Sequence, residues 1–285
     1  MRGNRVRPPF EESPEFLRML RRDPEADLAR VALEIARDVY PGLDPEPYLA
    51  RIDDLAARVR DRCAAVDRTR QVLGQINWVL FVEEGFQGNT DDYYDPRNSY
   101  LNEVIDRKTG IPISLSVLYW RLAERLGLTV AGVNLPAHFM LRVGRGDAAV
   151  FVDPFHAGAV LDREGCQKQV SRQLGQEVAL TDAHLAPCPP GLVVSRMLRN
   201  LKSIYLQNHD YPSAVPVQRR LAALNASDPE EQRDLGMLYL RVDRPADAVA
   251  PLQAYLEAHP SNTDAEVEAL RALLRAARRE VASRN

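Results

Sequence analysis

Hydrophobic residues recur at helical spacing through the first 85 residues of the chain. A first helix is expected around residues 27–40, and its apolar face carries Leu28, Val31, Ala32, Ile35 and Val39. A second apolar stripe begins at Tyr48 and passes through Cys63, which is expected as a small core residue. A third helix is expected over residues 70–84. The polar segment PGLDPEP at 41–47 separates the first two helices.

The pattern then changes to a polar loop and the most apolar helix of the chain. Residues 85–99 are rich in Gly, Asn and Asp and predict a long loop, with Asn98 or Ser99 capping a helix that runs to about Arg107. A buried helix is predicted from Pro112, which suits a first helical turn, to the Leu126-Gly127 break. Its N-terminus directs free N–H groups and a partial positive charge at whatever lies there.

Three strands are predicted next, and together they bring two chemical groups side by side. They cover Thr129–Leu135, Phe139–Val143 and Ala148–Asp153, with GRGD as a hairpin turn. A two-residue loop at Arg145-Gly146 would place His138 directly opposite Asp153, whereas a longer loop would shift the pairing. In this register one apolar face carries Phe139, Leu141, Val143, Val150 and Val152.

A repeat follows the strands. The segment LKSIYL at 201–206 matches LGMLYL at 235–240, an offset of 34 residues that is typical of tetratricopeptide repeats. Two repeats are expected at 192–225 and 226–259, with a capping helix at 263–282. The expected division of the chain is a disordered tail at 1–14, a helical plus strand domain at 15–188 ending in PCPP, and an all-α repeat domain at 189–285. The expected class is therefore α+β followed by helical repeats.

Composition excludes several classes of protein. The net charge of −3 gives no support to nucleic-acid binding. The three cysteines form no C-x-x-C pair, so neither a disulfide framework nor a zinc site is expected, and no metal or cofactor is predicted. No apolar run follows the N-terminal arginines and none is long enough to span a membrane, so a soluble, cytoplasmic protein without membrane contacts is expected.

His138 and Asp153 are the residue types that form the base half of a catalytic triad, in which the carboxylate orients the imidazole. The start of the buried helix, where a nucleophile would face that imidazole, contains Ser114 and no cysteine. Ser114 is either a capping residue or the nucleophile. Cys166 is a displaced alternative for the nucleophile. Asn98, Asn102 and His156 are expected either to line the cleft or to serve capping and rim roles; the remaining histidines, His184, His209 and His259, are expected at the surface or in packing.

The segments NSYLNEVIDRKTGIPISLSVLYWRLAERLGL, NLPAHFMLRV and FVDPF, followed by the repeats, resemble a bacterial family that joins a transglutaminase-like core to a tetratricopeptide tail and is often linked to invasion-regulator operons. The resemblance covers about residues 27–257. It implies a papain-like α+β core in which His138 and Asp153 match the base and the carboxylate. It places the nucleophile position near Pro112–Ser114, best matched to Ser114, where the superfamily's cysteine is missing.

Two functions follow as hypotheses. The first is a regulatory protein that binds a protein or peptide partner through the repeats or the cleft of a degenerate transglutaminase-like domain. The second is a Ser-His-Asp acyl hydrolase or transferase acting on peptide or amide bonds.

Overall fold

The computed structural model describes residues 10, 12–63, 69–260 and 264–284, and the chain divides into two compact units, residues 1–197 and 198–285. The tail expected at 1–14 lies mainly outside the described residues, and the first helix already begins at Pro14. The boundary expected at 187–190 lies at the start of helix α9 (Pro190–Gln207), whereas the two units divide within that helix. The first turns of α9 thus belong to the first unit, and they pack on its sheet: a Cβ built at Gly132 would lie 3.2 Å from Val193 Cγ2.

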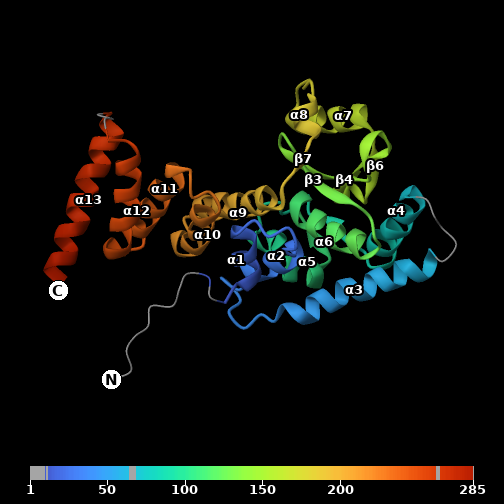
Figure 1. The fold of residues 1–285 in the computed structure, drawn as a ribbon, viewed down its shortest axis with the longest axis horizontal. Helices are drawn as coiled ribbons and strands as arrows, with labels where there is room; N and C mark the ends of the chain where they lie inside the picture. The colour runs from blue at the N-terminus through green and yellow to red at the C-terminus, as the bar shows by residue number, and fades with distance from the viewer. Residues whose placement is uncertain (1–9, 11, 64–68, 261–263, 285) are drawn as a thin grey trace. The chain divides into compact units, whose positions relative to one another are not determined.

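Helices form most of the first unit and surround its sheet (Figure 1). Two predicted elements differ from the expectation. The third predicted helix changes to a wider π-helical turn at Trp78. The helix that ends at Arg107 is preceded by Tyr100 and not by Asn98 or Ser99. The bounds are α1 Pro14–Leu20, α2 Leu28–Ala36, α3 Pro45–Arg62, α4 Thr69–Asn77, η1 Trp78–Glu83, η2 Pro96–Ser99, α5 Leu101–Arg107, α6 Pro112–Arg125, α7 Arg163–Leu174 and α8 Asp182–Leu185.

The apolar stripes predicted for the first helices are mostly buried, with exceptions at their ends that include the half-buried Tyr48. Leu28, Val31 and Ile35 of α2 are buried, but Val39 follows the helix and is 42% exposed. Cys63 likewise follows α3 and is half-buried, not a core residue. A stripe read from spacing alone extends past the true helix end, because the chain leaves the helical path there.

Helix α6 is the central support of the first unit. Pro112 occupies its first turn, where the missing N–H costs no hydrogen bond. Leu115, Leu118, Tyr119 and Leu122 are all at most 2% exposed. The helix contacts α2, α3, α5 and strands β3 (Val130–Leu135) and β4 (His138–Val143), so it is enclosed on several sides, as its apolar composition predicts.

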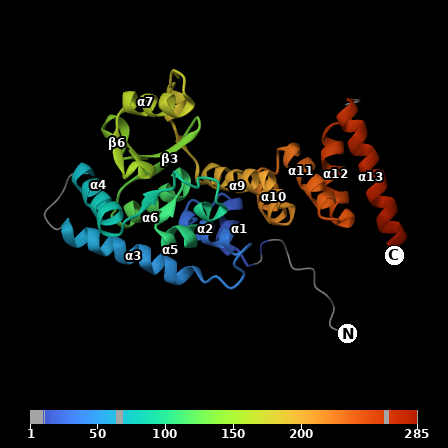
Figure 2. The same ribbon diagram turned by 180° about the vertical axis from the view of Figure 1, so that it is seen from behind.

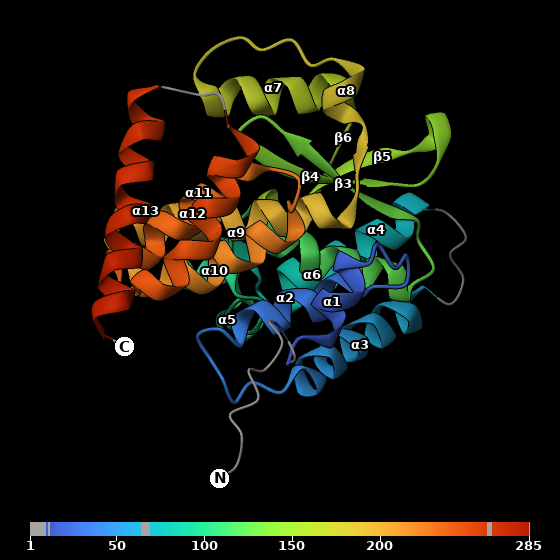
Figure 3. The same cartoon turned by 60° about the vertical axis from the view of Figure 1, so that its left-hand side comes forward.

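The sheet has five strands in the order β6-β5-β4-β3-β7, and every pairing in it is antiparallel. Figure 3 shows it with α7 and α8 on one side and α6 on the other. A separate parallel pair joins β1 Gln87–Gly88 to β2 Thr109–Gly110. The sheet strands are β3 Val130–Leu135, β4 His138–Val143, β5 Val150–Asp153, β6 Ala159–Leu161 and β7 Pro187–Cys188.

The register of the β4–β5 hairpin differs from the prediction by two residues. Leu141 pairs with Val152 and Val143 with Val150, so Asp153 lies two residues from the position opposite His138. The connection is longer than two residues, because residues 146–148 form a 3-10 turn and Gly144 adopts φ +96°. A shift of two residues keeps each side chain on its predicted face, because side chains alternate with a period of two.

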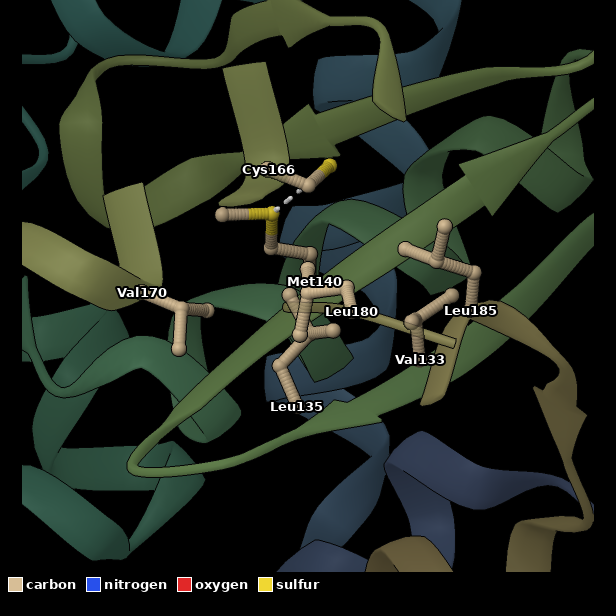
Figure 4. Close-up of a cluster of buried hydrophobic side chains, with 7 residues drawn as sticks. All are labelled: Val133, Leu135, Met140, Cys166, Val170, Leu180 and Leu185. Carbon is tan, nitrogen blue, oxygen red and sulfur yellow. Dashed lines mark hydrogen bonds between the residues drawn. The ribbon is translucent and has the colours of Figure 1, made fainter. Parts of the chain in front are cut away.

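Each face of the sheet has its own apolar cluster. Phe139, Leu141 and Val143 share one face with Val150 and Val152, as predicted. Met140 lies on the opposite face and packs with residues of α7 and of the segment that leads into α8 (Figure 4). That cluster consists of Val133, Leu135, Met140, Cys166, Val170, Leu180 and Leu185.

The second unit consists of helices that follow one another as antiparallel neighbours (Figure 2). The 34-residue offset places equivalent residues alike: Tyr211 begins α10, Pro245 begins α12, and Ala214 and Ala248 are both fully buried. The two predicted repeats are thus helix pairs, and the predicted cap is a helix. The bounds are α9 Pro190–Gln207, α10 Tyr211–Leu224, α11 Pro229–Arg241, α12 Pro245–Ala258 and α13 Ala265–Arg284.

Candidate functional site

His138 and Asp153 meet at one end of the sheet. His138 is the first residue of β4, and Asp153 is the last residue of β5. His138 Nε2 lies 2.8 Å from Asp153 Oδ2, and the side chains are 0% and 1% exposed. A buried carboxylate therefore orients a buried imidazole, as in the base half of a triad.

A second imidazole contacts the same carboxylate oxygen. Asp153 begins the 3-10 turn η4 (Pro154–His156), and its Oδ1 accepts the N–H of Phe155 at 3.1 Å. His156 Nδ1 lies 2.8 Å from Asp153 Oδ2, and the His156 side chain is 46% exposed. Burial opposes ionisation of Asp153, but the hydrogen bonds from His138 and His156 outweigh it and lower its pKa to about 2. The hydrogen bond to Asp153 raises the pKa of His156.

The turn that carries His156 is anchored to α4 and α6. Asn77 Nδ2 donates to the carbonyl of Gly158 at 2.7 Å, and the Tyr119 hydroxyl donates to Asn77 Oδ1 at 3.0 Å. The N–H of Gly158 donates to the carbonyl of Asp153 at 2.9 Å. These contacts fix both ends of the Asp153–Gly158 turn. The sequence interpretation missed Asn77, and no local pattern could have indicated it, because it lies 81 residues from Gly158.

The second ring nitrogen of His138 is Nδ1. Among the described residues, Nδ1 is buried and has no hydrogen-bond partner. The ring packs edge-on against Phe155, with 6.3 Å between ring centroids. This nitrogen is the one that would face a nucleophile, since Nε2 is held by Asp153.

Ser114, the predicted nucleophile, is engaged elsewhere. It lies fully buried in the first turn of α6, and its hydroxyl donates to the carbonyl of Asn98 at 2.6 Å. The same oxygen accepts the N–H of Ile111 at 3.1 Å. Within the described residues its hydrogen bonds thus join Asn98 and Ile111 and do not include His138. The geometry matches the capping alternative.

The two asparagines proposed to line the cleft are both buried. Asn98 Nδ2 donates to the carbonyl of Asp92 at 2.7 Å, and Asn98 Oδ1 accepts from Asn89 at 3.1 Å. Asn102 lies in α5 and is 4% exposed. Asn98 therefore orders the loop before α5, and through its carbonyl it also holds Ser114.

Cys166, the displaced alternative, lies in the core cluster of α7. Its Sγ is 3.8 Å from Met140 Sδ (Figure 4). Burial raises its pKa to about 12, so it is a thiol at neutral pH and lacks the thiolate that nucleophilic attack requires.

Comparison with known proteins identifies the family of the chain. The model of the transglutaminase-like superfamily matches residues 46–199, which is more than half of the chain. The chain belongs to the transglutaminase-like superfamily. A tetratricopeptide-repeat model matches residues 201–275, so the predicted α+β transglutaminase-like core followed by helical repeats is confirmed.

Relatives of this transglutaminase-like protein occur in bacteria and animals. A UPF0162 protein from Xylella fastidiosa is 36% identical over 86% of this chain and 88% of its own length. A UPF0162 protein from Pseudomonas aeruginosa is 30% identical over 79% and 82%. Human F-box only protein 21 is 35% identical over 49% of this chain and 22% of its own length. The solved structure of menin aligns with a TM-score of 0.38 at 12% identity, over 85% of this chain and 68% of menin, a likeness too low to support an argument.

The helices of the described residues include none that is both long and apolar enough to cross a membrane.

Proposed function

We propose that this transglutaminase-like protein is a non-catalytic regulatory protein that binds a protein or peptide partner. The observation that supports this most directly is the engagement of Ser114. Its hydroxyl has the Asn98 carbonyl as an acceptor at 2.6 Å and the Ile111 carbonyl at 3.2 Å, and His138 is not among its partners in the described residues. Its lone pair also accepts the N–H of Ile111. Attack by this oxygen would leave buried backbone groups unpaired, at about 1–3 kcal/mol each.

The repeat unit supplies a surface suited to a polar peptide. A pocket of about 390 Å³ lies between α9 and α11 and is lined by both cations and carboxylates, including Arg199, Lys202 and Asp234. Lys202 Nζ and Asp234 Oδ2 are 2.6 Å apart, and both groups remain partly exposed. Such groups can exchange their mutual contact for hydrogen bonds to a peptide backbone or side chain. Together with the match to tetratricopeptide repeats, this supports an interaction role.

The compartment we propose is the cytoplasm. Cys63, Cys166 and Cys188 are all free thiols, as is usual for proteins in a reducing environment.

Peptide binding can be tested with the full chain. Peptides are selected on it from a random display library, and their affinities are measured by fluorescence anisotropy. We expect saturable binding that is at least about tenfold weaker for Lys202→Ala, since one charge-assisted hydrogen bond contributes about 1.5–3 kcal/mol. Lys168 is an exposed lysine of the first unit. Lys168→Ala is therefore the matched control and should bind the selected peptides as the wild type does. Failure to select any peptide with saturable binding would count against the proposal.

The hydrolase alternative retains one favourable observation, the intact His138–Asp153 pair. A fluorophosphonate probe separates the two functions, because it labels activated serines covalently. We expect no labelling of Ser114 by mass spectrometry and no turnover of ester or amide substrates. Labelling of Ser114, together with an activity that Ser114→Ala abolishes, would refute the non-catalytic proposal and favour the hydrolase.

A further inference from the structure

We propose that His138, Asp153 and His156 form a binding site for one divalent transition-metal ion. One atom from each residue, His138 Nε2, Asp153 Oδ2 and His156 Nδ1, can serve as a ligand, and these atoms all lie within 4.8 Å of one another. They come from β4, β5 and η4, so the fold alone brings them together. The inference does not depend on the proposed function.

The separations of the two imidazole nitrogens from Asp153 Oδ2 suit an ion with six ligands. Imidazole nitrogens and carboxylate oxygens bind such metals at about 2.0–2.2 Å, so neighbouring ligand atoms lie roughly 2.9 Å apart in octahedral geometry and roughly 3.3 Å apart in tetrahedral geometry. Both nitrogens are 2.8 Å from Asp153 Oδ2. Two histidines and one carboxylate on one side of an ion leave other positions open, an arrangement that Fe²⁺ and related ions accept.

The charge at the site supports a cation independently of these separations. Asp153 is 1% exposed, and in the described part of the chain its ion-pair partners are the two imidazoles, with no lysine or arginine among them. A buried carboxylate is costly unless a positive charge or several donors compensate it. The two imidazoles and the Phe155 N–H supply hydrogen bonds to this carboxylate, and a bound cation would add a positive charge directly.

The surroundings hold the three ligands in place. Asp153 Oδ1 accepts the Phe155 N–H, which leaves Oδ2 to the two imidazoles. The Gln169 side-chain amide nitrogen lies 3.2 Å from His156 Nε2, and Gln169 Oε1 accepts a hydrogen bond from Arg172 at 3.3 Å. Outer contacts of this kind fix the ring of a metal-binding histidine. The half-exposed His156 provides the route by which an ion enters from solvent.

The experiment uses the full chain without an affinity tag, after chelation and desalting. Co²⁺ is added and its visible absorption recorded, and Zn²⁺ binding is measured by calorimetry and by competition with bound Co²⁺. We expect one ion per chain. We expect His156→Ala to weaken binding by at least roughly tenfold, because it removes a ligand, and Gln169→Ala to weaken it by roughly tenfold through the outer contact.

His184→Ala is the matched control, because His184 is a half-buried histidine in α8 whose Nδ1 accepts the N–H of Thr181. It should bind both ions as the wild type does. His156→Ala removes a half-exposed ring, and a thermal melt verifies that the variant is folded. The proposal is overturned if the wild type takes up no ion, or if folded His156→Ala binds with wild-type affinity and stoichiometry.

Discussion

Replacement of Gly158 by alanine tests how the turn that carries His156 is held. Gly158 has φ +71°, and a Cβ built there would lie 2.0 Å from Asn77 Oδ1. The Asn77 side chain would have to move. Its movement would break the hydrogen bonds to the Gly158 carbonyl and from the Tyr119 hydroxyl.

The magnitude follows from these two contacts. A non-glycine residue at positive φ costs about 1–2 kcal/mol, offset by about 0.4–1 kcal/mol from the stiffer unfolded chain. The buried Tyr119 hydroxyl left without a partner costs about 1–3 kcal/mol, and the hydrogen bond to the Gly158 carbonyl contributes about 1 kcal/mol. The loss of these two hydrogen bonds should therefore lower the free energy of unfolding of Gly158→Ala by about 2–4 kcal/mol, in addition to the loss caused by backbone strain.

Gly175 is the matched control, because its φ is +67° and nothing lies within 4 Å of a built Cβ. Both tryptophans, Trp78 and Trp120, belong to the first unit, so tryptophan fluorescence during urea or thermal unfolding reports on that unit. At about 2–4 °C per kcal/mol for a unit of this size, Gly158→Ala should melt several degrees below Gly175→Ala.

A double variant isolates the contact with Asn77. In an Asn77→Ala background the obstacle is gone, so Gly158→Ala should cost no more than Gly175→Ala does in the wild type. Equal losses for the two single glycine variants, or an undiminished loss in the Asn77→Ala background, would refute the role assigned to Asn77.

Three further predictions concern other buried polar groups. Ser114→Ala should destabilise the first unit by about 1–3 kcal/mol, because it leaves the Asn98 carbonyl and a backbone N–H unpaired; a loss below about 0.5 kcal/mol in tryptophan-monitored urea unfolding would argue against this. Burial opposes ionisation of Glu231, but hydrogen bonds from Arg199 and Gln218 outweigh it and lower its pKa, so its contribution to stability is present above the unfolded pKa of about 4.3 and is lost as the pH falls below it. The melting temperature of the wild type, followed by circular dichroism, should exceed that of Glu231→Gln at neutral pH, and the difference should narrow below about pH 4. A difference in melting temperature that is independent of pH would contradict this. Cys166, whose pKa burial raises to about 12, should resist iodoacetamide at neutral pH until the protein unfolds, and mass spectrometry that found it alkylated in the native protein would disprove its burial.

Much of the fold is readable from the sequence, because it rests on local periodicity. The apolar run of α6, the alternation in β4 and β5 and the 34-residue repeat each indicate their element without reference to distant residues. The contact between His138 and Asp153 could also be predicted from the sequence, although the predicted register is off by two residues. Their sharing of one sheet face survives any even shift.

What the sequence determined by itself is therefore the order of elements, the buried faces and the residue types at the start of α6. Tertiary structure alone decided the chemistry of the site. The partner of the Ser114 hydroxyl is a backbone carbonyl 16 residues away, His156 joins Asp153 through a 3-10 turn, and Asn77 fixes that turn from 81 residues away. Hydrogen bonds act over about 3 Å, and no periodic pattern specifies which distant groups the packed chain brings within that distance.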